Sequence, residues 1–175
     1  MNKLRKLTAE TILARKAGHD GLFTTSDLSL LLGEPMSPRF SKFLHKATKS
    51  KVLTRVCKNI YINPLMPPDG RAILAKIAKL IHWDKFIYIS LESQLSHLGL
   101  ISQILFDRIT IMTTGRSGKI ETLYGVIEFT HTEYSVESLT EDVYFDPDIE
   151  FFRAKEHKAI KDLKRVGRNI DMVTG

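Results

Sequence analysis

Residues 37–50, SPRFSKFLHKATKS, place hydroxyl and cationic side chains at a spacing that suits contact with an anion. Ser37 can act as an N-cap and Pro38 fits the first helical position, so the spacing predicts a helix that begins there. Its apolar residues recur at helical spacing and predict one buried stripe, formed by Phe40, Phe43, Leu44 and Ala47. The remaining faces are left for polar side chains.

Such a helix suits the DNA major groove, where the first residues of a recognition helix contact base edges. The residues predicted to face bases are Ser37, Arg39, Ser41, Lys42 and His45. The residues predicted to contact phosphates, which raise affinity without reading sequence, are Lys46, Lys49, Lys51, Arg55 and Lys58. The alternative is a small helical domain that is basic for solubility or for docking an acidic partner.

No enzyme chemistry is predicted. The turn TTGRSGK at residues 113–119 lacks a Walker A motif, because Thr113 stands where the first glycine is needed and Ile120 follows the lysine. We expect a glycine-rich hairpin turn there. His131 and Glu133 could form an acid/base pair, but alternation along a strand explains both equally well.

Metal, cofactor and redox chemistry are not predicted either. None of the six histidines lies at a zinc-ligand spacing from another or from Cys57, the single cysteine. Basic neighbours would lower the pKa of the Cys57 thiol, although a surface thiol without a role is the simpler interpretation. One cysteine excludes an internal disulfide and favours a cytoplasmic location. No apolar run reaches the ~20 residues of a membrane span, and we expect no signal peptide.

The elements around residues 37–50 have the order of a winged helix-turn-helix, three short helices followed by a hairpin. We expect a first helix from about Thr8 to Ala17. A second helix, SDLSLLLG, is capped near Thr24–Ser26 and ends at Gly33. Two strand-like runs, KVLTRV and NIYINP, then follow on either side of a polar turn.

A linker, PLMPPDG at residues 64–70, divides the chain. It predicts a winged helix-turn-helix DNA-binding domain at residues 1–66 and a C-terminal α+β domain at residues 69–175. The second domain is predicted to hold antiparallel strands with helices at its ends. The helices are expected at 71–82, 90–100 and 155–167, and the strands at 86–89, 108–114, 121–132 and 143–154.

Charge also differs between the parts of the chain before and after the linker. Residues 1–60 hold 12 Lys/Arg and 4 Asp/Glu, a net of +8, within a chain whose formal net charge is +6. Between Lys119 and Arg153 there are nine acidic residues and no Lys or Arg. This division suggests a polyanion-binding module joined to a part with another task. A second interpretation is an interaction adaptor whose acidic 120–150 region binds a basic partner, with only nonspecific nucleic-acid binding.

Three blocks of the second half, in order, resemble the AbiEi-type antitoxins of type IV toxin–antitoxin and abortive-infection operons. They are YISLESQLSHLGLISQ, then ITIMTTGRS with YGVIEFTHT, and finally FRAKEHKAIKDLKRVGRN. The resemblance implies an N-terminal winged helix that represses its own operon by binding promoter repeats in double-stranded DNA. It also implies a C-terminal domain that counters a nucleotidyltransferase-like toxin in phage defence. The implied action needs no stable complex with the toxin, and direct binding stays the lower-ranked alternative.

Overall fold

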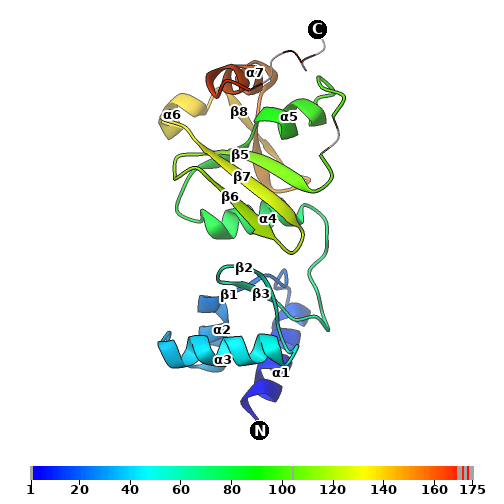
Figure 1. Ribbon diagram of the computed structural model, residues 1–175, viewed down its shortest axis with the longest axis vertical. Helices are drawn as coiled ribbons and strands as arrows, with labels where there is room; N and C mark the ends of the chain where they lie inside the picture. The colour runs from blue at the N-terminus through cyan, green and yellow to red at the C-terminus, as the bar shows by residue number, and fades with distance from the viewer. Residues whose placement is uncertain (1, 104, 169–170, 172, 174–175) are drawn as a thin grey trace. The chain divides into compact units, whose positions relative to one another are not determined.

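The computed structural model describes residues 2–103, 105–168, 171 and 173, and the fold is mixed α+β (Figure 1). The chain forms two compact units that divide between Ile73 and Leu74, called here the first and the second unit. Within the described ranges, no helix combines the length and the apolar character that crossing a membrane requires.

The first unit holds three helices and a small sheet. Its elements are α1 (Lys3–Lys16), β1 (Phe23–Thr24), α2 (Thr25–Leu32), α3 (Pro38–Lys49), β2 (Thr54–Cys57) and β3 (Ile60–Ile62). The three strands pair antiparallel in the order β1-β3-β2. The helices pack around a buried core that includes Leu7, Phe23, Leu28, Phe40, Leu44 and Leu53.

Helix α3 forms where its cap and its apolar spacing predict. The Ser37 hydroxyl accepts a hydrogen bond from the Phe40 N–H at 3.1 Å, and Pro38 occupies the first turn. Phe40, Leu44 and Ala47 are buried on one stripe. The predicted recognition segment is therefore a helix anchored in the core by that stripe, with its polar faces outside.

Replacing Ser37 with alanine should lower the free energy of unfolding by about 1 kcal/mol, because the Phe40 N–H loses its capping acceptor. Urea unfolding followed by circular dichroism measures the change. The matched control is Ser41→Ala, an exposed serine inside the same helix, for which we expect less than about 0.5 kcal/mol. Equal unfolding midpoints for the two variants would contradict the role of the cap.

One prediction in the first unit is wrong in detail, and one strand was not predicted. Helix α1 begins at Lys3, capped by Asn2, rather than at Thr8. The Thr8 hydroxyl lies inside the helix and donates to the Leu4 carbonyl at 3.1 Å. The strand that was not predicted is β1, just before α2, where Phe23 and Thr24 pair with β3.

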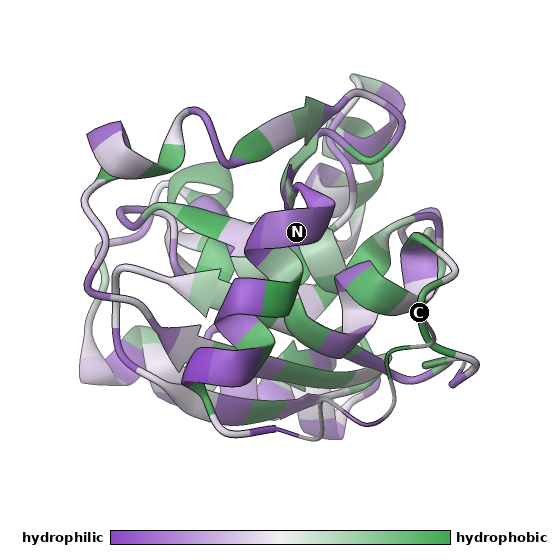
Figure 2. Ribbon diagram, turned by 90° about the horizontal axis from the view of Figure 1, so that it is seen from above, coloured by the Kyte–Doolittle hydropathy of each residue, from purple (hydrophilic) through white to green (hydrophobic). Residues whose placement is uncertain are grey.

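The second unit is a six-stranded sheet with helices on both faces. Its elements are α4 (Ile73–Ile81), β4 (Ile87–Ile89), α5 (Leu91–His97), β5 (Arg108–Thr113), β6 (Gly118–Thr122), β7 (Gly125–His131), α6 (Val136–Leu139), β8 (Val143–Asp146), β9 (Phe151–Ala154) and α7 (Glu156–Arg165). The strand order is β6-β7-β5-β4-β9-β8. Figure 1 shows α4 on one side of the sheet and α5, α6 and α7 on the other. Hydrophobic and hydrophilic residues occur within the same helices and strands, as Figure 2 shows.

The sheet is mixed, which corrects the prediction of antiparallel strands. β5 pairs parallel to β7, and β4 pairs parallel to β9. Residues 113–119 do not close a hairpin, because β6 pairs with β7 around a turn that ends at Gly125. Gly125 has φ +135°, and a Cβ there would collide with the Asp107 carbonyl, which accepts the Val126 N–H at 2.7 Å. This close approach places β7 beside β5.

A buried polar cluster lies where α7 meets the sheet. The Lys158 Nζ is 2.8 Å from an Asp162 carboxylate oxygen, and both side chains are 1% exposed. Ser90 occupies the N-cap position of α5, yet its side chain makes no cap hydrogen bond and donates to Asp162 at 2.7 Å. Tyr88 donates to the same carboxylate oxygen at 3.1 Å. The cluster ties α7 to β4 and to the start of α5.

Candidate nucleic-acid interface

The exposed side of α3 has a centre and two flanks, since successive helical residues are rotated by about 100°. Lys42, His45 and Lys49 lie opposite the buried stripe and point most directly away from the core. Ser41 and Thr48 lie on the flank next to the β2–β3 hairpin. The other flank carries Arg39 and Lys46, both exposed. Cations therefore occupy the outer face and the flank away from the hairpin.

The cations of this face are not neutralised by the protein. Within the described part of the chain, no ion pair involves Arg39, Lys42, Lys46, Lys49, Lys51, Arg55 or Lys58. All seven are exposed. The four carboxylates of residues 1–60 lie on other elements and are Glu10, Asp20, Asp27 and Glu34. An uncompensated positive face of this kind attracts a polyanion.

A polar pocket of about 250 Å³ opens between α3 and the hairpin. Its lining residues are Thr25, Ser41, Leu44, His45, Thr48, Arg55, Asn59 and Tyr61. The structure thus brings together three of the predicted site residues, Ser41, His45 and Arg55. The Ser37 hydroxyl is engaged as a cap. Lys51 and Lys58 lie in the turns that flank β2.

Four polar residues of this pocket were not among the site residues predicted from the sequence. They are Thr25, Thr48, Asn59 and Tyr61. Thr25 begins α2, and Asn59 lies in the β2–β3 turn. The Thr25 N–H donates a hydrogen bond to the Asn59 carbonyl at 3.0 Å. Asn59 has φ +62°, a left-handed conformation that asparagine tolerates. No local pattern joins these positions, because they belong to different elements.

Cys57 is buried, so the prediction of a surface thiol is wrong. Burial raises the pKa of the Cys57 thiol, while the Arg55 guanidinium acts in the opposite direction. A raised pKa leaves little thiolate, which is the reactive form. Cys57 is therefore a packing residue at the end of β2.

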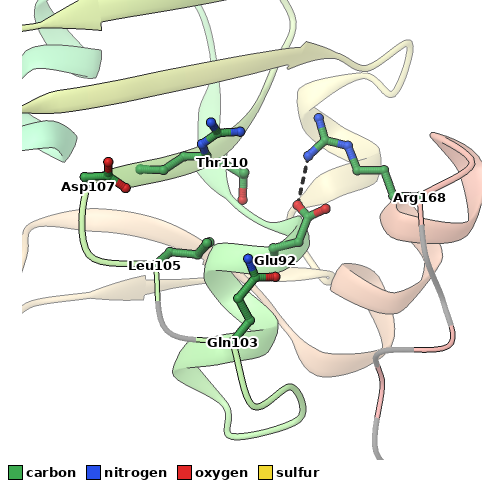
Figure 3. A pocket seen from close by; sticks show the side chains of 7 residues that line it. Glu92, Gln103, Leu105, Asp107, Thr110 and Arg168 are labelled. Carbon is green, nitrogen blue, oxygen red and sulfur yellow. Dashed lines mark hydrogen bonds and ion pairs between the residues drawn. The ribbon is translucent and has the colours of Figure 1, made fainter.

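The second unit has a pocket of about 370 Å³ whose charges are largely paired (Figure 3). Arg168 donates to Glu92 at 2.9 Å and also forms an ion pair with Glu128. Arg108 lies 3.5 Å from the Glu128 carboxylate. Both arginines of this pocket already have carboxylate partners, so it is poorly suited to a free anion.

The residues considered for catalysis or metal binding do not assemble. His131 contacts the Gly115 carbonyl at 2.7 Å, whereas Glu133 forms an ion pair with Arg165 at 2.9 Å. Among the described residues, no group of three or more His, Cys, Asp or Glu side chains is placed to hold a metal ion.

The acidic 120–150 region is partly compensated within the second unit. Four of its nine carboxylates make ion pairs, namely Glu128, Glu133, Asp142 and Asp146. A hydrogen bond from Arg153, at 2.6 Å, holds the pKa of Asp146 below its usual value. A hydrogen bond from His157 lowers the pKa of Asp142. These carboxylates stabilise the unit itself.

Comparison with known proteins gives a fold relationship. No described protein family matches the sequence, and no curated protein does. Among solved structures, the chain is similar to the RV2827C protein from Mycobacterium tuberculosis, with a TM-score of 0.63 and 12% sequence identity. The match covers 97% of this chain and 63% of that chain, so this chain spans less than two thirds of the other protein's length. The likeness shows a shared fold.

Proposed function

We propose that the first unit is a winged helix-turn-helix that binds double-stranded DNA through α3. The uncompensated cationic face of α3 and the hairpin carries this proposal. A short turn after Gly33 joins α2 to α3, and β2 with β3 provides the wing. Inserted in the major groove, α3 would direct Arg39 and Lys42, near its start, toward base edges.

For the whole chain we propose a DNA-binding antitoxin of a type IV toxin–antitoxin system, as the AbiEi resemblance implies. It would repress its own operon through the first unit and counter a nucleotidyltransferase-like toxin through the second. The proposal rests on the three resembling blocks, two of which meet in the buried cluster, since Tyr88 and Ser90 belong to one block and Lys158 and Asp162 to another. The last residue of that block, Asn169, lies outside the described residues.

The adaptor interpretation has weaker support. It requires an acidic surface that is available to a basic partner, yet four of the nine carboxylates between Lys119 and Arg153 are engaged inside the second unit. The cations of α3 have no such internal partners within the described ranges. The charge pattern therefore favours a polyanion at the first unit.

A reporter fused to the DNA upstream of the chain's own gene tests the proposed function in cells. Expression of the wild-type chain should repress the reporter. The Arg39→Ala/Lys42→Ala variant should lose repression at equal protein level, because both changes fall on the proposed base-reading part of α3. Equal repression by the two proteins would contradict the proposal.

Lys49→Ala and Lys58→Ala should each weaken binding to specific and scrambled DNA by the same factor, since phosphate contacts carry no sequence information. Each should also reduce the slope of log K against log salt concentration by about 0.9, the value for one lost phosphate contact. Binding titrations at several salt concentrations measure both effects. Lys16→Ala, an exposed change at the end of α1, is the control. A changed ratio between the two DNAs would refute the phosphate assignment.

A further inference from the structure

We infer that the pocket between α3 and the β2–β3 hairpin seats one phosphate group of the DNA backbone. The inference rests on the proposed DNA binding and gives the hairpin-side flank of α3 a defined ligand. Arg55 supplies the charge, while Thr25, Ser41 and Asn59 supply hydrogen-bond donors. Ser41, predicted to face a base, is thereby reassigned to the backbone.

The pocket is lined by side-chain donors that have no acceptor among the described residues. The Thr25 hydroxyl oxygen is buried and has no hydrogen-bond partner in the part of the chain that the structure describes. The side chains of Ser41, Asn59 and Tyr61 also form no hydrogen bond among the described residues, although all three line the pocket. A buried donor without an acceptor destabilises the fold. The buried Thr25 hydroxyl, with the exposed donors of Ser41 and Asn59 around the same concave site, indicates that a ligand supplies the missing acceptor.

The charge at the pocket identifies this ligand as an anion. The Arg55 Nε donates to the Cys57 carbonyl at 3.2 Å, which orients the guanidinium. Its two terminal nitrogens have no hydrogen bond or ion pair within the described ranges, and no lining residue is a carboxylate. In the pocket of the second unit, by contrast, Arg108 and Arg168 are paired with glutamates. An unpaired guanidinium beside neutral donors suits phosphate oxygens.

Groove geometry indicates that the phosphate belongs to DNA. A helix about 10–12 Å across fills a major groove about 12 Å wide, so each of its flanks faces one phosphate backbone. The flank with Lys46, a predicted phosphate contact, faces one backbone. The other backbone then passes on the side of Ser41 and the hairpin, where the pocket opens.

Methylphosphonate substitution tests the inference with the full chain. In a duplex that the chain binds, each phosphate is replaced in turn by a neutral methylphosphonate. At one linkage the wild-type protein should lose about tenfold in affinity, the loss of a charge-assisted contact. Arg55→Gln should lose less than about twofold at that same linkage, because its charge partner is already absent. Thr25→Val, which replaces the hydroxyl with a methyl group, should also reduce the loss of affinity that the methylphosphonate causes at that linkage.

The matched control for Arg55→Gln is Arg5→Gln on α1, which should keep the full loss at that linkage. Arg5 is exposed and has no ion pair with any described residue. If DNA binds but Arg55→Gln loses as much as wild type at every linkage, the pocket inference fails while the proposed function stands. Failure of the full chain to bind any DNA would overturn both. Inorganic phosphate should show no saturable binding in calorimetry. Saturable binding that Arg55→Gln abolishes would make the pocket a free-phosphate site and overturn the DNA assignment.

Discussion

Replacing Lys158 with methionine should destabilise the second unit by about 3–5 kcal/mol, the effect of removing one partner from a buried ion pair. The Lys158 ammonium is 2.8 Å from the Asp162 carboxylate, and both groups are almost completely buried. Without the lysine, the carboxylate is left in the interior with only the hydroxyls of Ser90 and Tyr88. Two neutral donors cannot replace the charge, so the cost is large.

Urea unfolding followed by circular dichroism measures this effect. Lys161→Met is the control, since Lys161 lies on the same helix but is exposed, and its replacement should cost less than about 1 kcal/mol. A double variant, Lys158→Met with Asp162→Leu, should recover much of the loss because no unpaired charge remains. If Lys158→Met unfolds at the same urea concentration as Lys161→Met, the buried pair is not a determinant of stability.

Arg39→Ala and Lys42→Ala should each weaken binding to the specific site by about 1–3 kcal/mol if their side chains reach bases. That range corresponds to roughly 5- to 150-fold in affinity for each variant. Both residues lie in the first turns of α3, are exposed and have no internal ion pair within the described ranges. The loss should be much smaller on scrambled DNA, where no base-specific contact exists to be removed.

Fluorescence anisotropy with labelled duplexes measures both affinities. Arg5→Ala on α1 is the control, because it removes the same charge outside α3. Circular dichroism should confirm that each variant is folded, as expected for exposed positions. Unchanged binding by both Arg39→Ala and Lys42→Ala would remove α3 as the recognition helix.

The helices of the first unit follow from local signals, whereas the sheet of the second unit does not. Ser37, Pro38 and the apolar stripe determine α3 within a single segment, so its bounds were predictable. The parallel pairing of β5 with β7 depends on Gly125 meeting the Asp107 carbonyl, a contact between residues far apart in the sequence. The predicted hairpin at residues 113–119 was wrong because no local pattern encodes that contact.

In the candidate site, too, some features follow from local sequence and others depend on residues that are far apart in the chain. The exposed cations of α3 were predicted from helical spacing and charge, which are local properties. The pocket beside them combines α2, α3 and the hairpin, so the contribution of Thr25 and Asn59 became visible only in the fold. The burial of Cys57 likewise depends on packing around the hairpin. Ser90 has a cap position, yet its hydroxyl donates to Asp162 from a distant helix.

The most direct test of DNA-specific binding is fluorescence anisotropy of the full chain against DNA from immediately upstream of its own gene. A scrambled duplex of the same composition is titrated in parallel, and both are measured at two salt concentrations. We expect the upstream DNA to bind at least ~10³-fold more tightly than the scrambled duplex, as a specific repressor does. Equal and steeply salt-dependent binding to both duplexes would contradict the account, because it would reduce the first unit to a basic surface without sequence recognition.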